Sequence, residues 1–223
     1  MRAISPSSLG RVYACPASAA LPHEPDTSGP AAQYGTQVHA LRAFAIAAGE
    51  YPHPFDELHA EVKIAHDYRT DRARPITIPG DREYGELGPT EIAGTIDALG
   101  VTRDRDNDRA HVTVIDWKTG RRSDHTAQLE WYALAASRLF QTTDAVCRVT
   151  YIGKNHPSEF TDSWTMDLSD LARTLARVAT VAHRVSMLRK LHVIPHTTPT
   201  PGIHCRYCPA KPHCPAQHIE STL

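Results

Sequence analysis

The stretches EIAGTIDALGV at residues 91–101 and HVTVIDWK at residues 111–118 decide the fold. Both are rich in β-branched residues, which is typical of strands. The residues between them, TRDRDNDRA at 102–110, are charged and predict a turn. The two stretches therefore predict an antiparallel hairpin, which brings Asp97 close to residues 116–118 on the neighbouring strand.

Two carboxylates and a lysine lie in this hairpin. Side chains alternate along a strand, so Asp116 and Lys118 point to one face and Trp117 points to the other. An Asp-x-Lys tripeptide alone is more often a surface ion pair. Here Asp116 ends an apolar run, where an unpaired carboxylate is costly unless it is solvated or bound to a ligand. Together with Asp97 it predicts a site for Mg²⁺ or Mn²⁺, with Lys118 as a positive partner.

A basic loop and a helix follow the second strand. The loop contains Arg121 and Arg122, which are suited to contact phosphate groups. The helix predicted over 124–140 carries Gln128 and Tyr132 one turn apart, so their polar tips share a face. An ordinary amphipathic helix with a half-buried Tyr132 explains the same pattern.

The remaining elements surround this unit. Helices are predicted over 5–20, 35–49, 56–69 and 169–191, and strands over 75–78, 82–87, 145–152 and 160–168. The order predicts one mixed α/β domain over 1–223, with a helical part at 1–70, a catalytic sheet core at 71–168 and a long helix with a Cys-rich tail at 169–223. His39 begins the second helix. A lone histidine there usually caps the helix or faces solvent, so it becomes a metal ligand only by converging with Asp97 and Asp116.

Composition sets outer limits on function. The chain has 223 residues, 24 Lys and Arg, 25 Asp and Glu, and a net charge of −1. This balance argues against a simple basic nucleic-acid binder but not against a local basic patch. The N-terminal sequence has no apolar segment typical of a signal peptide, and no apolar stretch is long enough to span a bilayer. We therefore expect a cytoplasmic protein without membrane contact.

The cysteines predict a second metal site. Three of the five lie close together in the tail: Cys205, Cys208 and Cys214. In a reducing compartment, clustered thiols more often bind metal than form disulfides. A fourth ligand from His218 makes a Cys₃His zinc site, whereas Cys15 gives four thiolates, which suit an iron–sulfur cluster. The residues alone leave both open, and Cys147 fits a small buried apolar residue.

Several short motifs occur in a fixed order along the chain. They are Ser5-Pro6-Ser7 before Cys15-Pro16, Gly35-Thr36-x-x-His39, Gly94-x-x-Asp97, Asp116-x-Lys118-Thr119-Gly120, Gln128-x-x-x-Tyr132 and the cysteine triplet. In this order they resemble the RecB-like nucleases of the PD-(D/E)xK superfamily, over nearly the whole chain. The resemblance is strongest to the iron–sulfur members, which are the CRISPR-associated RecB-like exonucleases and their phage-encoded relatives. It implies a restriction-endonuclease-like α/β fold, with a mixed β-sheet flanked by helices and a C-terminal Cys-rich cluster-binding tail.

The resemblance also implies a role for each motif. The catalytic Mg²⁺ or Mn²⁺ would be held by His39, Asp97, Asp116 and the backbone carbonyl of Trp117. Lys118 would be the catalytic lysine, and the residues that contact DNA or support the site would be Gln128, Tyr132, Arg121 and Arg122. A four-iron, four-sulfur (4Fe-4S) cluster would be held by Cys15, Cys205, Cys208 and Cys214. An acidic residue before Asp97 sometimes assists in this family, and Glu83, Glu86 and Glu91 all qualify here.

The activity implied is metal-dependent hydrolysis of DNA, as an exonuclease on single strands or DNA ends. The alternative is a non-catalytic DNA-binding or assembly module of the same fold with a structural iron–sulfur or zinc site. The sequence has no Walker-type motif and so carries no ATP-driven motor of its own. Expected partners are DNA and a helicase, a recombinase or a CRISPR adaptation protein. The resemblance also makes an oligomer one possible state, because some family members form rings. The expected compartment is a bacterial cytoplasm, or the host cytoplasm if a phage encodes the chain.

Overall fold

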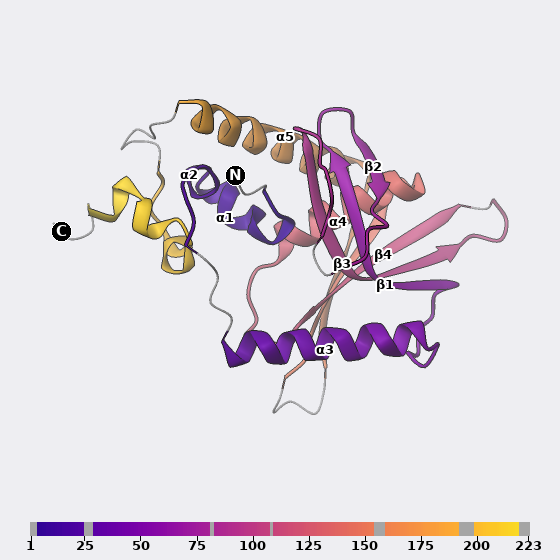
Figure 1. Cartoon of the computed structure of the whole chain (residues 1–223). Helices are drawn as coiled ribbons and strands as arrows, with labels where there is room; N and C mark the ends of the chain where they lie inside the picture. Colours follow the sequence, from indigo (N-terminus) through magenta and orange to yellow (C-terminus); the bar gives the residue numbers. More distant parts are fainter. Residues whose placement is uncertain are drawn as a thin grey trace.

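The computed structural model describes residues 4–24, 29–80, 83–107, 109–153, 159–191 and 199–218. In this part of the chain six strands form one sheet in the order β2-β1-β3-β4-β5-β6 (Figure 1). The strands are β1 (Glu57–Asp67), β2 (Arg72–Pro75), β3 (Glu91–Arg103), β4 (Ala110–Lys118), β5 (Ala145–Tyr151) and β6 (Phe160–Met166). The α-helices are α1 (Leu9–Ala14), α2 (Ala17–Ala20), α3 (Pro30–Ala47), α4 (Thr126–Phe140) and α5 (Leu168–Lys190). Short 3-10 helices are η1 (Pro6–Ser8), η2 (Ile203–Tyr207), η3 (Lys211–His213) and η4 (Pro215–His218).

Helices cover both faces of the sheet (Figure 1). On one face, α4 and α5 enclose the main hydrophobic core, in which Trp131, Leu134 and Leu171 are fully buried. On the other face, Ile46 of α3 packs against a smaller cluster that contains Trp117. This arrangement confirms the expected mixed sheet flanked by helices.

The central hairpin and the second half of the chain follow the prediction. β3 and β4 pair antiparallel, with Ala98 opposite Ile115. β4 and β5 pair parallel, and α4 makes the crossover that a parallel pair requires. Strands β5 and β6 and helix α5 form within a few residues of the predicted bounds.

The N-terminal third differs from the prediction. The helix expected over 56–69 is wrong, because these residues form strand β1, which pairs with both β2 and β3. Its Glu, Ala and Lys residues favour helix locally, but pairing on both sides outweighs this weak preference. The sheet therefore begins inside the segment 1–70 that was expected to be helical. The helix expected over 5–20 is divided into η1, α1 and α2, because Cys15 is extended and Pro16 follows it.

Two further expected strands are also misplaced. The strand expected over 75–78 lies earlier, as β2. Within the strand expected over 82–87, residues 83–87 form no regular element, and residue 82 lies outside the described residues. Instead, Tyr84 and Leu87 pack over the sheet against Ala65 and Ala93. A loop that covers a sheet face buries apolar side chains without strand pairing. The apolar residues alone therefore did not distinguish a strand from such a loop.

The two longest helices differ in character. α5 begins at an Asp167 N-cap with a capping box, and its apolar side buries Leu171, Val178 and Val185. α3 is apolar on most sides and exposes Phe44. Even so, none of the helices within the described ranges combines the length and the apolar character that a membrane crossing requires.

Candidate active site

In each of the strands β1 and β3 the alternation of side chains between the two faces of the sheet is interrupted at one point. In β1, Val62 packs into the core beneath α4, whereas Leu58, four residues earlier, packs beneath α3. In β3, Ile96 packs beneath α4 and Ala98 packs beneath α3. Residues an even number of positions apart share a face in a regular strand, so the alternation is interrupted in both strands. The interruption leaves an acidic residue on each strand next to α3.

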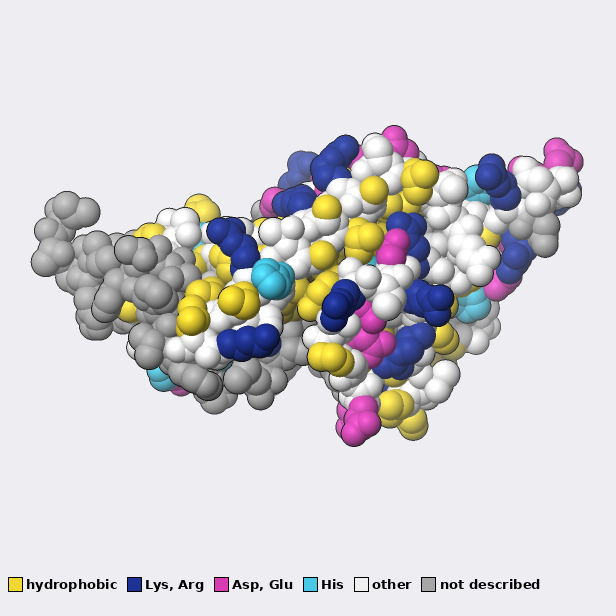
Figure 2. Space-filling view, turned by 90° about the horizontal axis from the view of Figure 1, so that it is seen from above, with side chains coloured by type: hydrophobic (Ala, Val, Ile, Leu, Met, Phe, Trp, Pro, Cys, Tyr) yellow, Lys and Arg dark blue, Asp and Glu magenta, His cyan; other side chains and the backbone are white. Residues whose placement is uncertain are grey.

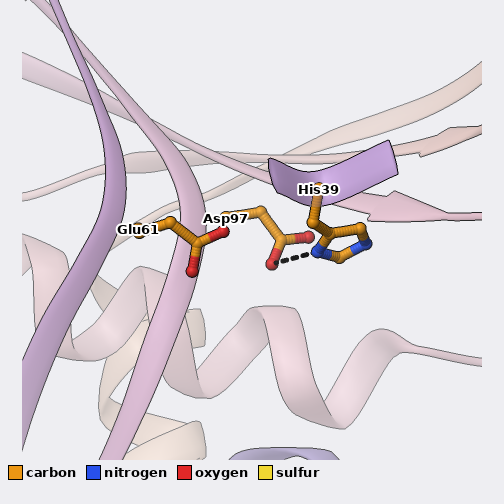
Figure 3. Close-up of side chains that lie close together, drawn as sticks. All are labelled: His39, Glu61 and Asp97. Atoms are coloured by element: carbon orange, nitrogen blue, oxygen red, sulfur yellow. Dashed lines mark ion pairs between the residues drawn. The ribbon is translucent and has the colours of Figure 1, made fainter. Parts of the chain in front are cut away.

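These acidic residues are Glu61 and Asp97. On either side of them Ala60 pairs with Ala98 and Val62 pairs with Ile96, so Glu61 and Asp97 lie opposite each other. Together with His39 of α3 they offer three ligand atoms that all lie within 4.8 Å of one another (Figure 3). The Asp97 carboxylate lies 3.3 Å from Nδ1 of His39 and accepts a 2.7 Å hydrogen bond from the backbone N–H of Trp117. Nε2 of His39 donates to the carbonyl oxygen of Trp117 at 2.9 Å. One imidazole thus connects α3, β3 and β4.

Glu61 is the acidic residue that the sequence did not single out. It lies on β1, which was expected to be a helix, and its backbone is left-handed with φ 51°. Such a conformation is costly for a residue other than glycine and often marks a functional site. Of the acids proposed instead, Glu91 forms an ion pair with Arg74 (2.7 Å), and neither Glu83 nor Glu86 belongs to the close group around Asp97. A positive φ is not visible in a sequence, so pattern reasoning had no signal for Glu61.

A second group of polar side chains adjoins the first. The Lys118 ammonium lies 2.8 Å from Oδ2 and 3.0 Å from Oδ1 of Asp116. Gln128 of α4 donates to Oδ1 of Asp116 at 3.0 Å and lies 3.5 Å from the hydroxyl of Tyr132. The structure therefore brings the Asp-x-Lys and Gln-x-x-x-Tyr motifs into contact. Asp116 stands beside the close group of Asp97 rather than within it.

Burial controls the electrostatics of this region. Asp116 is 2% exposed, and removal from water raises the pKa of its carboxyl, with Lys118 acting in the opposite sense. The pKa of His39 is raised, chiefly by its hydrogen bond to Asp97. Burial also raises the pKa of the Tyr132 hydroxyl, which therefore stays protonated. A cation bound between these carboxylates would favour their ionised forms and compete with the proton on His39.

Two glycines allow these elements to approach closely. A Cβ at Gly35 of α3 would lie 3.1 Å from Oγ1 of Thr119, directly after Lys118. A Cβ at Gly94 would lie 2.6 Å from Pro6 and 2.9 Å from the ring of Tyr132. The glycines of two motifs thus let helices pack against the strands that carry the site.

Comparison with known proteins agrees with this geometry. A family model described as the PD-(D/E)XK nuclease superfamily matches residues 3–215. The chain belongs to this superfamily. Among curated proteins none matches. Among solved structures, the crystal structure of SSO0001 is similar at 22% sequence identity and a TM-score of 0.41, over 84% of this chain and 72% of that chain.

The two arginines that were predicted to contact phosphate groups follow Lys118 in the chain. Here Arg122 forms an ion pair with Asp162 (2.7 Å) and stacks over the ring of Phe160 at 4.7 Å. Arg121 is exposed. The predicted phosphate contact thus has one arginine already engaged with β6, and the role of both arginines stays a prediction.

The cysteines lie at a separate place. Cys15 and the three tail cysteines, Cys205, Cys208 and Cys214, line one cavity of about 40 Å³. Cys15 and Cys205 accept hydrogen bonds, 3.4 Å long in each case, from the backbone N–H groups of Thr200 and Gly202. Cys147 is fully buried in the main core, as expected. The zinc alternative depended on His218, whose side chain lies outside the described residues.

Proposed function

We propose that this chain is a metal-dependent DNA nuclease that hydrolyses phosphodiester bonds, acting as an exonuclease on single-stranded DNA or DNA ends. The observation that carries the proposal is the convergence of His39, Glu61 and Asp97 next to the buried pair of Asp116 and Lys118. Carboxylates with one imidazole suit Mg²⁺ and Mn²⁺, and the imidazole favours Mn²⁺. Superfamily membership supports the same chemistry.

The donor set fits such a cation. Glu61 and Asp97 offer carboxylate oxygens from opposing positions, and Asp116 adds a third carboxylate whose burial makes an uncompensated negative charge costly. His39 offers its imidazole, and the carbonyl oxygen of Trp117 lies beside Nε2. When bound, the ion would polarise the phosphate and lower the pKa of a bound water molecule.

The remaining residues position charge and protons. Lys118 holds its ammonium against Asp116, where it would stabilise the charge that develops on the phosphate oxygens. Gln128 fixes the orientation of the Asp116 carboxylate, and Tyr132 packs behind Gln128 as a protonated hydroxyl. The Trp117 N–H holds Asp97 from the backbone, so this carboxylate needs little reorganisation to act.

A non-catalytic module of the same fold is the competing function. Asp116 is 2% exposed and lies beside a lysine, and burying these charges costs free energy. In a module that binds no cation at this site, nothing would offset that cost. Degradation of end-labelled single-stranded DNA with Mn²⁺ tests the choice. We expect activity in the wild type, loss of activity in Asp116→Asn, and unchanged activity in Asp144→Asn, which removes a surface carboxylate. Equal activity in wild type and Asp116→Asn would refute catalysis at this site.

We also propose that the four cysteines hold a structural 4Fe-4S cluster. These four residues line one cavity, and the sulfurs of Cys15 and Cys205 accept hydrogen bonds from backbone N–H groups. Four thiolates would suit such a cluster, which would connect Cys15 to the tail.

The colour of anaerobically purified protein distinguishes an iron–sulfur cluster from a zinc ion. We expect a brown protein with a broad absorbance near ~400 nm and with about four iron atoms and four sulfides per chain. A colourless protein with one zinc ion would refute the cluster. This result is independent of the nuclease assay, because the cavity lies apart from the carboxylates.

The setting of this activity is part of the proposal. Because the sequence has no Walker-type motif, duplex opening would come from a partner such as a helicase or a recombinase. The relation to CRISPR adaptation or to phage recombination stays a prediction.

A further inference from the structure

The near-neutral net charge conceals a strong asymmetry along the chain. Residues 171–219 contain seven of the 24 Lys and Arg and none of the 25 Asp and Glu. They also contain six of the 14 histidines. The segment comprises most of α5 and the cysteine tail, so the positive charge gathers in one part of the fold.

The structure separates the neutralised from the unneutralised charges of α5. In its first half, Arg173 pairs with Asp170 at 2.7 Å, and Arg177 pairs with Glu130 of α4 at 3.3 Å. In its second half, Arg184 and Lys190 are exposed, and no ion pair to an acid is observed for either within the described residues. Positive charge therefore increases toward the C-terminal end of α5.

The tail continues this charge. Arg206 and Lys211 are exposed, and Arg206 stacks on the ring of Tyr207 at 5.3 Å. α5 packs against α2, and α2 and the tail line the same cysteine cavity, so the two basic segments belong to one lobe. We call Arg184, Lys190, Arg206 and Lys211 the basic surface. Figure 2 looks down on the side where α5 lies and shows separate Lys, Arg and His side chains on this face, with hydrophobic and uncharged groups between them.

The basic surface is connected to the active site through α4. Glu130, the partner of Arg177, lies two residues after Gln128, which contacts Asp116. α5 begins at the opposite end of the sheet, where Met166 pairs with Ala145. It passes the end of α4 that carries the site at Arg177 and then leads toward the tail (Figure 1). A substrate whose end reaches Asp116 can extend along this direction.

We propose that the basic surface binds the sugar–phosphate backbone of a duplex segment of the DNA substrate, outside the active site. Surfaces that hold single strands combine positive charge with aromatic rings on which bases stack, and residues 171–190 contain no Phe, Tyr or Trp. The α5 part of the surface, Arg184 and Lys190, therefore has charge without a stacking ring, whereas the exposed Tyr207 lies beside Arg206 in the tail. Charge without rings fits a duplex, whose bases are stacked inside and whose phosphates lie outside. The inference rests on the proposed nuclease function and adds the form of DNA that the site receives.

Binding of fluorescent DNA in EDTA, at several salt concentrations, tests the proposal without catalysis. The double variant Arg184→Gln, Lys190→Gln removes two charges from the surface. The matched control Arg105→Gln, Arg109→Gln removes two charges from the β3–β4 turn, at the other end of the molecule (Figure 1). For the first variant we expect about tenfold weaker duplex binding and a salt slope reduced by about two, because each lost phosphate contact releases about one counterion fewer. The control should bind as the wild type does.

Three outcomes would overturn the proposal: unchanged duplex binding, equal losses in both variants, or a loss confined to single-stranded DNA. Unchanged duplex binding together with loss of an acidic protein partner would assign the surface to that protein instead. Hydrolysis of bis(p-nitrophenyl) phosphate with Mn²⁺ separates this inference from the nuclease function, because this small diester does not reach the surface. We expect equal rates in all three proteins, and an inactive wild type would refute the nuclease function alone.

Discussion

The active site and the cysteine cavity are built in opposite ways. The active site rests on the central strands β3 and β4, and its acids are held by backbone and side-chain hydrogen bonds inside the folded sheet. The cavity joins Cys15, at a break between two short helices, to 3-10 turns that lie nearly two hundred residues later in the chain. No strand contributes to it among the residues that the structure describes.

The difference predicts how each region depends on its ligand. The hydrophobic core shapes the active site whether or not a cation is present, so a change there should alter chemistry and spare the fold. The cavity has few regular hydrogen bonds to keep it closed, so a change there should alter stability and spare the chemistry of the remaining folded molecules.

The largest effect is expected from Lys118→Met. Among the described residues the ammonium bonds Asp116 and Gln128. Without it the buried Asp116 can take up a proton, because burial already raises the pKa of its carboxyl, so the melting temperature should stay within a few degrees of the wild type. Loss of one stabiliser of transition-state charge should lower the rate on single-stranded DNA by about 10²- to 10³-fold. Initial rates and thermal melting measure both quantities. A variant that keeps its rate, or that loses activity only because it unfolds, would contradict the expectation that a change in the active site alters the chemistry and spares the fold.

Cys15→Ser tests the corresponding expectation for the cysteine cavity. If Cys15 holds the cluster, the variant should lose iron and melt about 10 °C lower, since a chain of this size loses about 2–4 °C per kcal/mol. Loss of the link would also open the loop that runs from Cys15 to Cys205, which is most of the chain. Cys147→Ala is the matched control, because Cys147 is also buried but lies in the main core. It should keep its iron, and a Cys15→Ser protein with full iron content would exclude Cys15 as a ligand.

The sequence was sufficient where local pattern and long-range pairing agree. The hairpin of β3 and β4 follows from strand alternation and the charged turn, whereas a place for Gln128 at the site was implied by the family resemblance. It was insufficient for β1, whose residues prefer helix locally and become a strand because two neighbours pair with it. The missed acid Glu61 has the same cause, since its position opposite Asp97 exists only once β1 is a strand.

Glu61 offers an intermediate effect that separates strain from function. Its φ of 51° costs about 1–2 kcal/mol in a residue with a Cβ, and glycine removes this cost. Glu61→Gly should therefore be more stable than Glu61→Ala by about 1 kcal/mol in urea unfolding, despite the flexibility of glycine in the unfolded chain. Both variants should lose about tenfold or more in Mn²⁺-dependent rate if Glu61 is a ligand. Equal stability of the two would mean that the backbone there is not strained.

The smallest effect concerns the scaffold that holds the sheet against α4. His66 of β1 is fully buried and bonds Asp71 at 3.1 Å, and Asp71 also pairs with Arg138 of α4 at 2.8 Å. Burial lowers the pKa of His66, so the folded state holds it neutral. The unfolded chain binds a proton near the ordinary histidine pKa of about 6.5, so this contribution to stability is present above that pH and is lost as pH falls below it.

Urea unfolding between pH 7 and pH 5 measures this dependence. His66→Gln should be less stable at pH 7 but should lose less stability on acidification than the wild type. His59→Gln, which changes an exposed histidine on the same strand, should keep the wild-type slope. Because the His66 network belongs to the sheet and not to the cysteine cavity, the slope should persist in the Cys15→Ser protein. A slope that vanishes with the iron would mean that the two regions fold as one cooperative unit and that their contrast does not extend to stability.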